Sequence, residues 1–168
     1  YAGRLDKAKG FFIMLNAWCR LPESAERTLW IIGEKQGEDA PLERWLHVAS
    51  KRNDIHWPGI ADQQNLASKM KQVHCTIIPS ECIEIGPLVF HEAIAAGSDV
   101  IASDIGGCKE LGEIYAGKTT LFKAGKPGDL AQKIMQFEFS GKWLRVANQL
   151  ENYEKVLKSY SEIKVKNL

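Results

Sequence analysis

The stretch that decides the fold is residues 74–104, which read HCTIIPSECIEIGPLVFHEAIAAGSDVIASD. Residues 74–78 are apolar and β-prone and end at Pro79-Ser80, which predicts a buried strand. Residues 88–96 form a strongly apolar segment that ends at Gly97, which is typical of a buried helix. Residues 99–102 then predict a second buried strand. A strand, a helix and a strand joined by short loops indicate a parallel βαβ unit.

The same alternation continues on both sides of this unit. Toward the N-terminus we expect helices at 11–21, 41–52 and 63–72, and strands at 28–32 and 54–57, the latter stopped by Pro58-Gly59. Toward the C-terminus we expect a helix at 108–114, a strand at 119–122, a helix from about 129 and a helical tail at 142–160. We therefore predict an α/β protein, a three-layer α/β/α Rossmann-like domain with a doubly wound parallel sheet.

Length and composition predict one domain and exclude several classes of function. The chain has 168 residues, of which 45% are hydrophobic and 26% charged, so it can bury a core. We expect residues 1–140 to form the Rossmann-like domain and residues 141–168 a C-terminal helical tail of that domain. The net charge is +1, from 22 basic and 21 acidic residues, which argues against nucleic acid as a partner. The apolar runs are too short to span a bilayer, which needs about 20 residues.

The cysteines and histidines do not form a metal-binding pattern. The four cysteines lack C-x-x-C spacing, and the four histidines are scattered along the chain. We expect reduced thiols, and we expect neither a metal site nor a cofactor.

Several glycines and polar residues follow the predicted strands. They are Gly33, Gly59, the segment 80–86 and the segment 104–107. Because ligands of doubly wound sheets bind outside the carboxyl ends of the strands, these positions predict a ligand cleft.

The N-terminal segment Gly3-Arg4-Leu5-Asp6-Lys7-Ala8-Lys9-Gly10 can bind phosphate. Gly3 allows close approach of the backbone, and Arg4 and Lys9 can converge on a diphosphate, with the positive end of the following helix dipole adding to the potential. A solvated turn is the alternative reading. The segment is neither a G-x-G-x-x-G fingerprint nor a P-loop.

Two glutamates stand on either side of the predicted start of the helix at 88–96. Glu84 lies in the loop, and Glu92 lies inside an otherwise apolar helical segment, where a carboxylate is costly without a partner. Vicinal sugar hydroxyls suit such a carboxylate, because it accepts two hydrogen bonds at once. The free backbone amides of Ile85, Gly86 and Leu88 can face a phosphate or a sugar hydroxyl, whereas Pro87 donates nothing. A buried glutamate paired with a lysine or a helix cap is the alternative.

These motifs resemble those of the family-4 retaining glycosyltransferases, which have the GT-B fold. The similar parts are Pro79-Ser80, Glu84 and Glu92 with seven residues between them, Ala93-Ile94-Ala95-Ala96-Gly97, Asp104 with Gly106-Gly107-Cys108-Lys109-Glu110, and the opening Gly3-Arg4-Leu5 with Lys9-Gly10. The resemblance covers about residues 1–160. The chain departs from the family in having Gly86-Pro87 where Phe-Gly is usual.

The resemblance implies roles for these residues. Arg4 and Lys9 would hold the donor diphosphate, Glu92 the ribose hydroxyls, and Glu84 the transferred sugar. Gly3 and the 85–88 segment (Ile85, Gly86, Pro87, Leu88) would line the donor site, and Gly59 and Ile60 would lie against the base.

The resemblance also implies an activity and partners. A hexose would pass from a nucleotide diphosphate sugar to an acceptor hydroxyl with retention of configuration, without a metal or other cofactor. The chain would be the donor-binding half of the enzyme, inactive by itself, and an N-terminal domain before Tyr1 would bind a saccharide or lipid-linked acceptor. We expect a cytoplasmic enzyme that can work at the inner face of the cell membrane.

Other functions remain as alternatives. One is a non-catalytic Rossmann-like module that binds a nucleotide or phosphate in the same cleft. A receiver-like signalling domain needs clustered acidic residues after the first strand, and these are not visible. The order of the motifs disfavours a GT-B epimerase.

Overall fold

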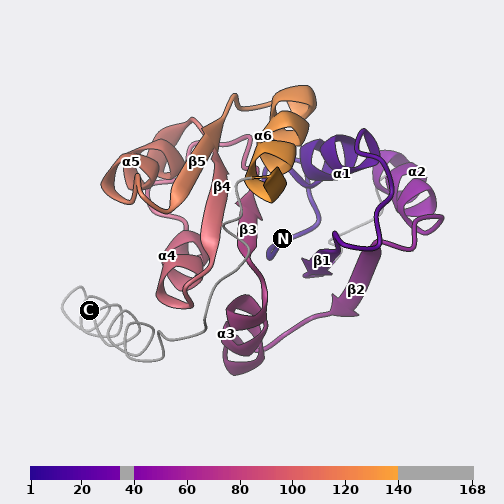
Figure 1. Cartoon of the computed structure of the whole chain (residues 1–168), viewed down its shortest axis with the longest axis horizontal. Coiled ribbons are helices and arrows are strands. Elements are labelled where there is room, and N and C mark those ends of the chain that lie inside the picture. The colour runs from indigo at the N-terminus through magenta and orange to yellow at the C-terminus, as the bar shows by residue number, and fades with distance from the viewer. Residues whose placement is uncertain (35–39, 140–168) are drawn as a thin grey trace.

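The structure is a computed structural model, and it describes residues 1–34 and 40–139. Its helices are α1 (Phe11–Cys19), α2 (Ala40–Ala49), α3 (Gln63–Gln72), α4 (Leu88–Ala95), α5 (Gly106–Ile114) and α6 (Pro127–Phe139). Its strands are β1 (Leu29–Ile32), β2 (Ile55–Gly59), β3 (Cys75–Ile78), β4 (Asp99–Ser103) and β5 (Thr119–Phe122). This strict alternation confirms the predicted α/β class (Figure 1). The predicted tail at 141–168 lies outside the described residues.

All strand pairs of the described chain are parallel. Hydrogen bonds join β1 to β2 in one sheet and β3, β4 and β5, in that order, in another. The first residues extend the smaller sheet: Ala2 pairs with Ile32, and the Gly3 amide donates to the Ile32 carbonyl at 3.0 Å. The N-terminus thus lies between β1 and β3 (Figure 1).

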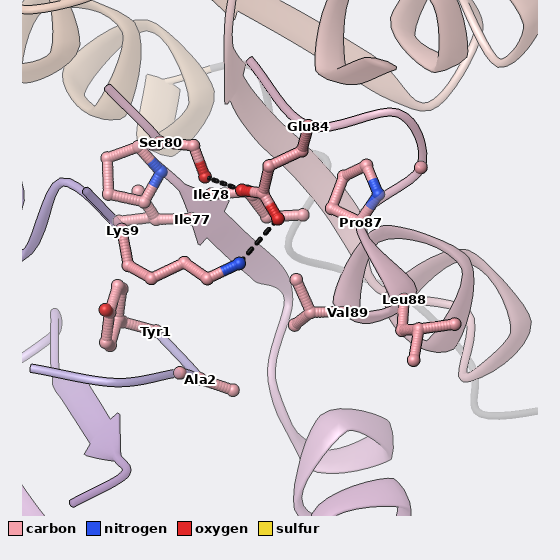
Figure 2. Close-up of a pocket in the computed structure, with 13 residues that line it drawn as sticks. Tyr1, Ala2, Lys9, Ile77, Ile78, Ser80, Glu84, Pro87, Leu88 and Val89 are labelled. Atoms are coloured by element: carbon pink, nitrogen blue, oxygen red, sulfur yellow. Dashed lines mark hydrogen bonds and ion pairs between the residues drawn. The ribbon is translucent and has the colours of Figure 1, made fainter. Parts of the chain in front are cut away.

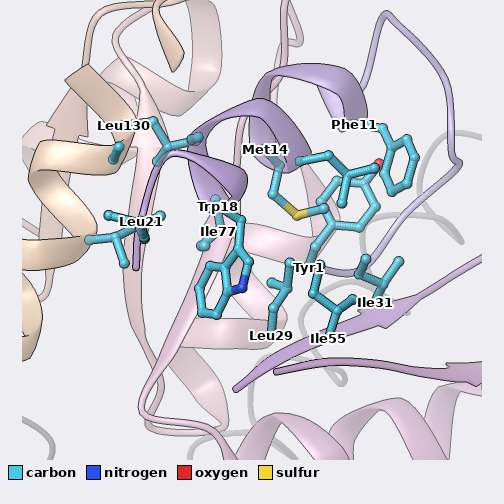
Figure 3. Packing of buried hydrophobic residues seen from close by; sticks show 14 of the residues in the cluster. Tyr1, Phe11, Met14, Trp18, Leu21, Leu29, Ile31, Ile55, Ile77 and Leu130 are labelled. Carbon is cyan, nitrogen blue, oxygen red and sulfur yellow. The ribbon is translucent and has the colours of Figure 1, made fainter. Parts of the chain in front are cut away.

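The side chains of the strands alternate between two cores, which defines the three layers. Ile77 and Ile101 belong to a cluster shared with α1, α2 and α6, whereas Ile78 and Val100 belong to a cluster shared with α4 and α5. Because successive residues of a strand face opposite sides of the sheet, the two clusters cover its two faces. Figure 3 shows Met14 and Trp18 of α1 among the strand residues of the first cluster.

The prediction that Pro58-Gly59 stops the second strand is wrong. β2 continues through Pro58 to Gly59, with a shift of register opposite the segment between Trp30 and Ile32. Within the described residues β2 pairs only with β1, so it is an edge strand. An edge strand tolerates proline, because the missing N–H can lie on the side without a partner strand.

Two helices begin earlier than the sequence predicts. α5 begins at Gly106 rather than near 108, and α6 begins at Pro127 rather than near 129. Proline is favoured at the first position of a helix, where its missing N–H has no acceptor to lose.

Candidate functional site

A cleft of about 300 Å³ lies at the carboxyl end of β3, a volume at the lower end of the range for ligand sites. It is lined by Tyr1, Ala2, Gly3, Lys9, Ile77, Ile78, Pro79, Ser80, Glu84, Gly86, Pro87, Leu88 and Val89 (Figure 2). These residues come from the N-terminal segment, from β3 and the loop after it, and from the start of α4. Six of the predicted site residues are therefore together in one cavity: Gly3, Lys9, Glu84, Gly86, Pro87 and Leu88.

The centre of the cleft is an ion pair between Lys9 and Glu84. The Lys9 ammonium lies 2.5 Å from Oε2 of Glu84, and the Ser80 hydroxyl donates to Oε1 of Glu84 at 2.5 Å (Figure 2). The Lys9 side chain is 30% exposed and that of Glu84 17%. A cation and a carboxylate 75 residues apart in sequence thus face the same small volume.

The backbone of Glu84 is held by the start of α5. The amide of Gly107 donates to the carbonyl of Glu84 at 2.6 Å. A Cβ at position 107 would overlap the carbonyls of Glu84 and Ile85, so only glycine allows this approach. The glycine pair that begins α5 therefore has a steric role in placing Glu84.

Lys9 is held by a turn that packs against the end of β3. Its amide donates to the Asp6 carboxylate at 2.8 Å. Gly10 follows with a φ of 67°, and a Cβ there would overlap the carbonyl oxygen of Pro79. The Glu81 amide also donates to the carbonyl of Ala8 at 2.9 Å, which ties the turn to the loop after β3.

The Arg4 side chain lies outside the cleft. It is 51% exposed, and its Nε is 3.0 Å from the Asp6 carboxylate. The Tyr1 hydroxyl donates to the Arg4 carbonyl, which fixes the backbone but not the guanidinium. The structure therefore does not show Arg4 and Lys9 converging on one point.

The start of α4 presents backbone donors to the cleft. Pro87 is the N-cap of the helix, and its carbonyl accepts from the Phe90 amide at 2.9 Å. Within the described chain, the amides of Ile85, Gly86 and Leu88 have no backbone acceptor. The Ile85 side chain is 98% exposed and does not line the cleft.

Glu92 lies one helical turn after Leu88, on α4, and does not line the cleft. Its side chain is half-buried, and it forms no hydrogen bond or ion pair with the residues that the structure describes. Burial raises the pKa of its carboxyl above the usual value. The alternative of a glutamate paired with a lysine therefore finds no support for Glu92 in the described part of the chain, whereas Glu84 does pair with Lys9.

Gly59 and Ile60 lie at the carboxyl end of the edge strand. The Gly59 carbonyl accepts from the Gly33 amide at 3.1 Å, and the Ile60 side chain is 69% exposed. Gly33 in turn packs so closely against Gly3 that a Cβ there would overlap the Gly3 carbonyl. Gly59 thus connects to the cleft through its backbone neighbours, although it does not line it.

Some residues that form the cleft have no role predicted from the sequence. Ser80 was visible at the predicted strand end, but its contact with Glu84 depends on the loop geometry. Tyr1 and Ala2 line the cleft because they extend the smaller sheet.

The described residues contain neither a metal-binding group of side chains nor a membrane-spanning helix. Over residues 1–34 and 40–139, no group of three His, Cys, Asp or Glu side chains is placed to hold a metal ion. None of the helices in those ranges is long and apolar enough to cross a bilayer.

Two curated relatives match about two thirds of this chain's length. It is 32% identical to D-inositol 3-phosphate glycosyltransferase of Jonesia denitrificans over 114 residues, which are 64% of this chain and 27% of that protein. It is 29% identical to an uncharacterized glycosyltransferase of Methanocaldococcus jannaschii over 111 residues, 66% of this chain and 28% of that protein. The match thus spans less than a third of each relative.

Solved structures share the fold. HepE of Anabaena, solved in complex with UDP-glucose, superposes with a TM-score of 0.72 at 20% identity, over 96% of this chain and 47% of that one. The C-terminal domain of a group 1 glycosyl transferase, LpcC of Francisella tularensis, superposes with a TM-score of 0.71 at 23% identity, over 94% and 83%. These likenesses establish a Rossmann-like domain of the kind found in GT-B glycosyltransferases.

The sequence model of one family covers almost the whole chain. It describes the glycosyl transferases of group 1 and matches residues 1–159, which include every predicted site residue. The chain therefore belongs to the group 1 glycosyl transferases.

Proposed function

We propose that this chain is the donor-binding half of a retaining, family-4-like glycosyltransferase, which transfers a hexose from a nucleotide diphosphate sugar to an acceptor hydroxyl. The observation that carries the proposal is the cleft itself. It combines the cation of Lys9, the carboxylate of Glu84 and the unpaired amides of the α4 start in one cavity at the carboxyl end of the sheet. These three groups match the diphosphate and the sugar hydroxyls of such a donor. The UDP and UDP-glucose complexes of HepE support the same class of ligand.

In this proposal the cations stabilise the leaving group. Lys9 exchanges Glu84 for the donor diphosphate, and the exposed Arg4 swings from Asp6 onto the same phosphates. Negative charge develops on the diphosphate as the glycosidic bond breaks, so two cations fixed beside it lower the barrier. No metal ion or other cofactor is needed for this step.

The remaining site residues bind the rest of the donor. Glu84 accepts hydrogen bonds from the hexose hydroxyls, and Glu92 accepts them from the ribose, which would supply the partner that it lacks in the described chain. The amides of Ile85, Gly86 and Leu88 bind phosphate or sugar oxygens, Pro87 fixes the start of α4, and Gly3 lets the donor approach the backbone. Gly59 and Ile60 lie against the base.

The acceptor and the cellular place of the reaction are also proposals. A saccharide or lipid-linked acceptor would bind to a second, N-terminal domain, and transfer would occur in the cytoplasm or at the inner face of the membrane.

The test is isothermal calorimetry with UDP, GDP and ADP. We expect at least one of them to bind, and Lys9→Met to weaken that binding about 10-fold or more, because hydrogen bonds to charged groups contribute about 1.5–3 kcal/mol. Lys51→Met, which removes an exposed lysine before β2, is the matched control and should leave binding unchanged. Absence of binding by all three nucleotides to a folded sample would overturn the proposal.

A further inference from the structure

Ser80 is the buried polar residue of the cleft that the proposed mechanism leaves without a role. It follows Pro79 directly after β3 and is 3% exposed. Its hydroxyl donates to Oε1 of Glu84 at 2.5 Å (Figure 2). A buried hydroxyl that donates to a carboxylate in a ligand cleft can affect ligand binding by fixing the orientation of that carboxylate.

The two oxygens of Glu84 have partners of different kinds. Oε2 contacts the ammonium of Lys9, at the end of a flexible side chain that is 30% exposed. Oε1 accepts from the hydroxyl of Ser80. Ser80 is a buried residue, and its short side chain has one rotatable bond. The loop beyond Ser80 is fixed in turn, since the Glu81 amide donates to the Ala8 carbonyl. Lys9 can therefore leave Glu84 for another anion, whereas Ser80 cannot.

This asymmetry matters when a diphosphate enters the cleft. The phosphates compete with Glu84 for Lys9, and Glu84 then loses one of its two side-chain contacts. A glutamate side chain has three rotatable bonds, so a carboxylate with no remaining contact would spread over several rotamers and bind a sugar less well.

We propose that Ser80 is a positioning residue for Glu84, which keeps the carboxylate oriented toward the hexose once Lys9 has moved to the diphosphate. The inference rests on the proposed function. In this arrangement Oε1 remains bonded to Ser80, and Oε2, released by Lys9, accepts a sugar hydroxyl. Ser80 therefore affects the affinity for the sugar part of the donor and not that for the nucleotide part.

The experiment compares UDP with UDP-glucose by calorimetry, using the 168-residue chain; GDP and GDP-mannose replace them if the nucleotide panel favours guanine. In Ser80→Ala we expect the Kd of the nucleotide sugar to rise about 5-fold, the usual effect of one hydrogen bond. The Kd of the free nucleoside diphosphate should change less than about twofold. Ser80→Cys, which keeps the volume but donates weakly, should show the same selective loss and serves if the alanine variant folds poorly.

Ser98→Ala is the matched control. Ser98 is also a buried serine, 1% exposed, and its hydroxyl lies 2.9 Å from the hydroxyl of Thr76, near the opposite end of β3. Removing it takes away one buried hydroxyl from the same sheet but none from the cleft. We expect a similar fall in melting temperature for both serine variants, with selective loss of sugar affinity only for Ser80→Ala.

A double-mutant cycle with Glu84→Ala tests whether Ser80 acts through Glu84. If it does, Ser80→Ala weakens UDP-glucose binding in the wild-type background and has no further effect in Glu84→Ala. Two results would overturn the inference while leaving the proposed function intact. One is that Ser80→Ala weakens UDP-glucose binding equally in both backgrounds. The other is that it leaves the ratio of the UDP and UDP-glucose Kd values unchanged. Failure of the wild-type chain to bind any nucleotide would overturn the proposed function, and the inference with it.

Discussion

Two carboxylate–cation pairs lie at opposite ends of the parallel strands, and they are built differently. Lys9 and Glu84 meet at the carboxyl end of β3, where their side chains are 30% and 17% exposed. Arg52 and Asp54 meet just before the amino end of β2, where their side chains are 13% and 2% exposed. The first pair lines a cleft, whereas the second is enclosed by protein.

Both members of the Arg52–Asp54 pair are hydrogen-bonded within the protein. Arg52 donates to both carboxylate oxygens of Asp54, at 2.8 and 2.6 Å, and to the Leu21 carbonyl at 3.1 Å. Burial alone raises the pKa of Asp54, but the hydrogen bonds and the positive charge of Arg52 outweigh it and hold the pKa below its usual value. This pair joins the end of α1 to the start of β2, which is a structural task.

The Lys9–Glu84 pair, in contrast, leaves donor and acceptor capacity unused. The Lys9 ammonium has three protons, and Glu84 Oε2 retains room for a second hydrogen bond beside the cavity. The difference indicates that an ion pair with only protein around it contributes to stability, whereas one that faces a cavity can exchange partners with a ligand.

The largest effect on stability should come from Arg52→Ala. It leaves the carboxylate of Asp54 buried without a counter-charge, so we expect a loss of about 3–5 kcal/mol in the free energy of unfolding, measured by urea denaturation. Lys51→Ala, an exposed neighbour, should change it by less than about 0.5 kcal/mol. A loss below about 1 kcal/mol for Arg52→Ala would contradict the structural role of this pair.

Lys9→Met should show the opposite pattern. We expect nucleotide affinity to fall about 10-fold or more, as removal of a charged hydrogen bond predicts, while the free energy of unfolding changes by about 1 kcal/mol or less. Calorimetry and urea denaturation of the same sample give both values. A loss of stability comparable with that of Arg52→Ala, with nucleotide affinity retained, would remove the distinction between the two pairs.

Glu92→Gln should weaken nucleotide binding about 5-fold, because an amide accepts fewer and weaker hydrogen bonds from the ribose than a carboxylate. The same change should raise the melting temperature at pH 7, since half-burial of the charged form raises the pKa of Glu92 and thus disfavours the folded state there. Thermal denaturation should show this gain shrinking as the pH falls and the wild-type carboxyl becomes protonated. A lower melting temperature with unchanged nucleotide affinity would assign Glu92 to packing.

The smallest effect concerns pH. The pKa of Asp54 is lower in the folded than in the unfolded state, so the pair's contribution is present above the unfolded value, about 3.9, and is lost as the pH falls through the folded value. Urea denaturation at pH 7 and pH 3 should show a smaller acid-induced loss for Arg52→Ala than for the wild type. Equal acid-induced losses in the free energy of unfolding for the two proteins would mean that Arg52 does not stabilise the charged form of Asp54.

The sequence predicted the strands of the larger sheet well, because β3, β4 and β5 are short, rich in apolar and β-branched residues, and bounded by Pro, Ser or polar residues. It failed at Pro58, where the outcome depends on whether the strand lies at an edge. That property belongs to the whole sheet and has no local signal.

The site was predicted in its residue types but not in its contacts. Lys9 and Glu84 were identified with different tasks, and nothing in a spacing of 75 residues indicates that they pair with each other. Ser80 acquires its contact only through the loop geometry, and Arg4 lies against Asp6, its near neighbour in sequence. Motif spacing thus identifies which groups a site has, and the tertiary structure decides which of them meet before the ligand arrives.

A UDP titration followed by two-dimensional ¹H–¹⁵N NMR tests most directly whether the cleft beside Lys9 is the nucleotide site; GDP replaces UDP if the calorimetry panel favours it. We predict that the largest shifts occur at the amides of Gly3, Gly86 and Leu88, and that the amides of Asn53 and Ile55 beside the Arg52–Asp54 pair stay unchanged. Lys9→Met should reduce these shifts at the same nucleotide concentration, because it weakens binding about 10-fold or more. Saturable binding whose shifts avoid the first group of amides would contradict the assignment of the cleft.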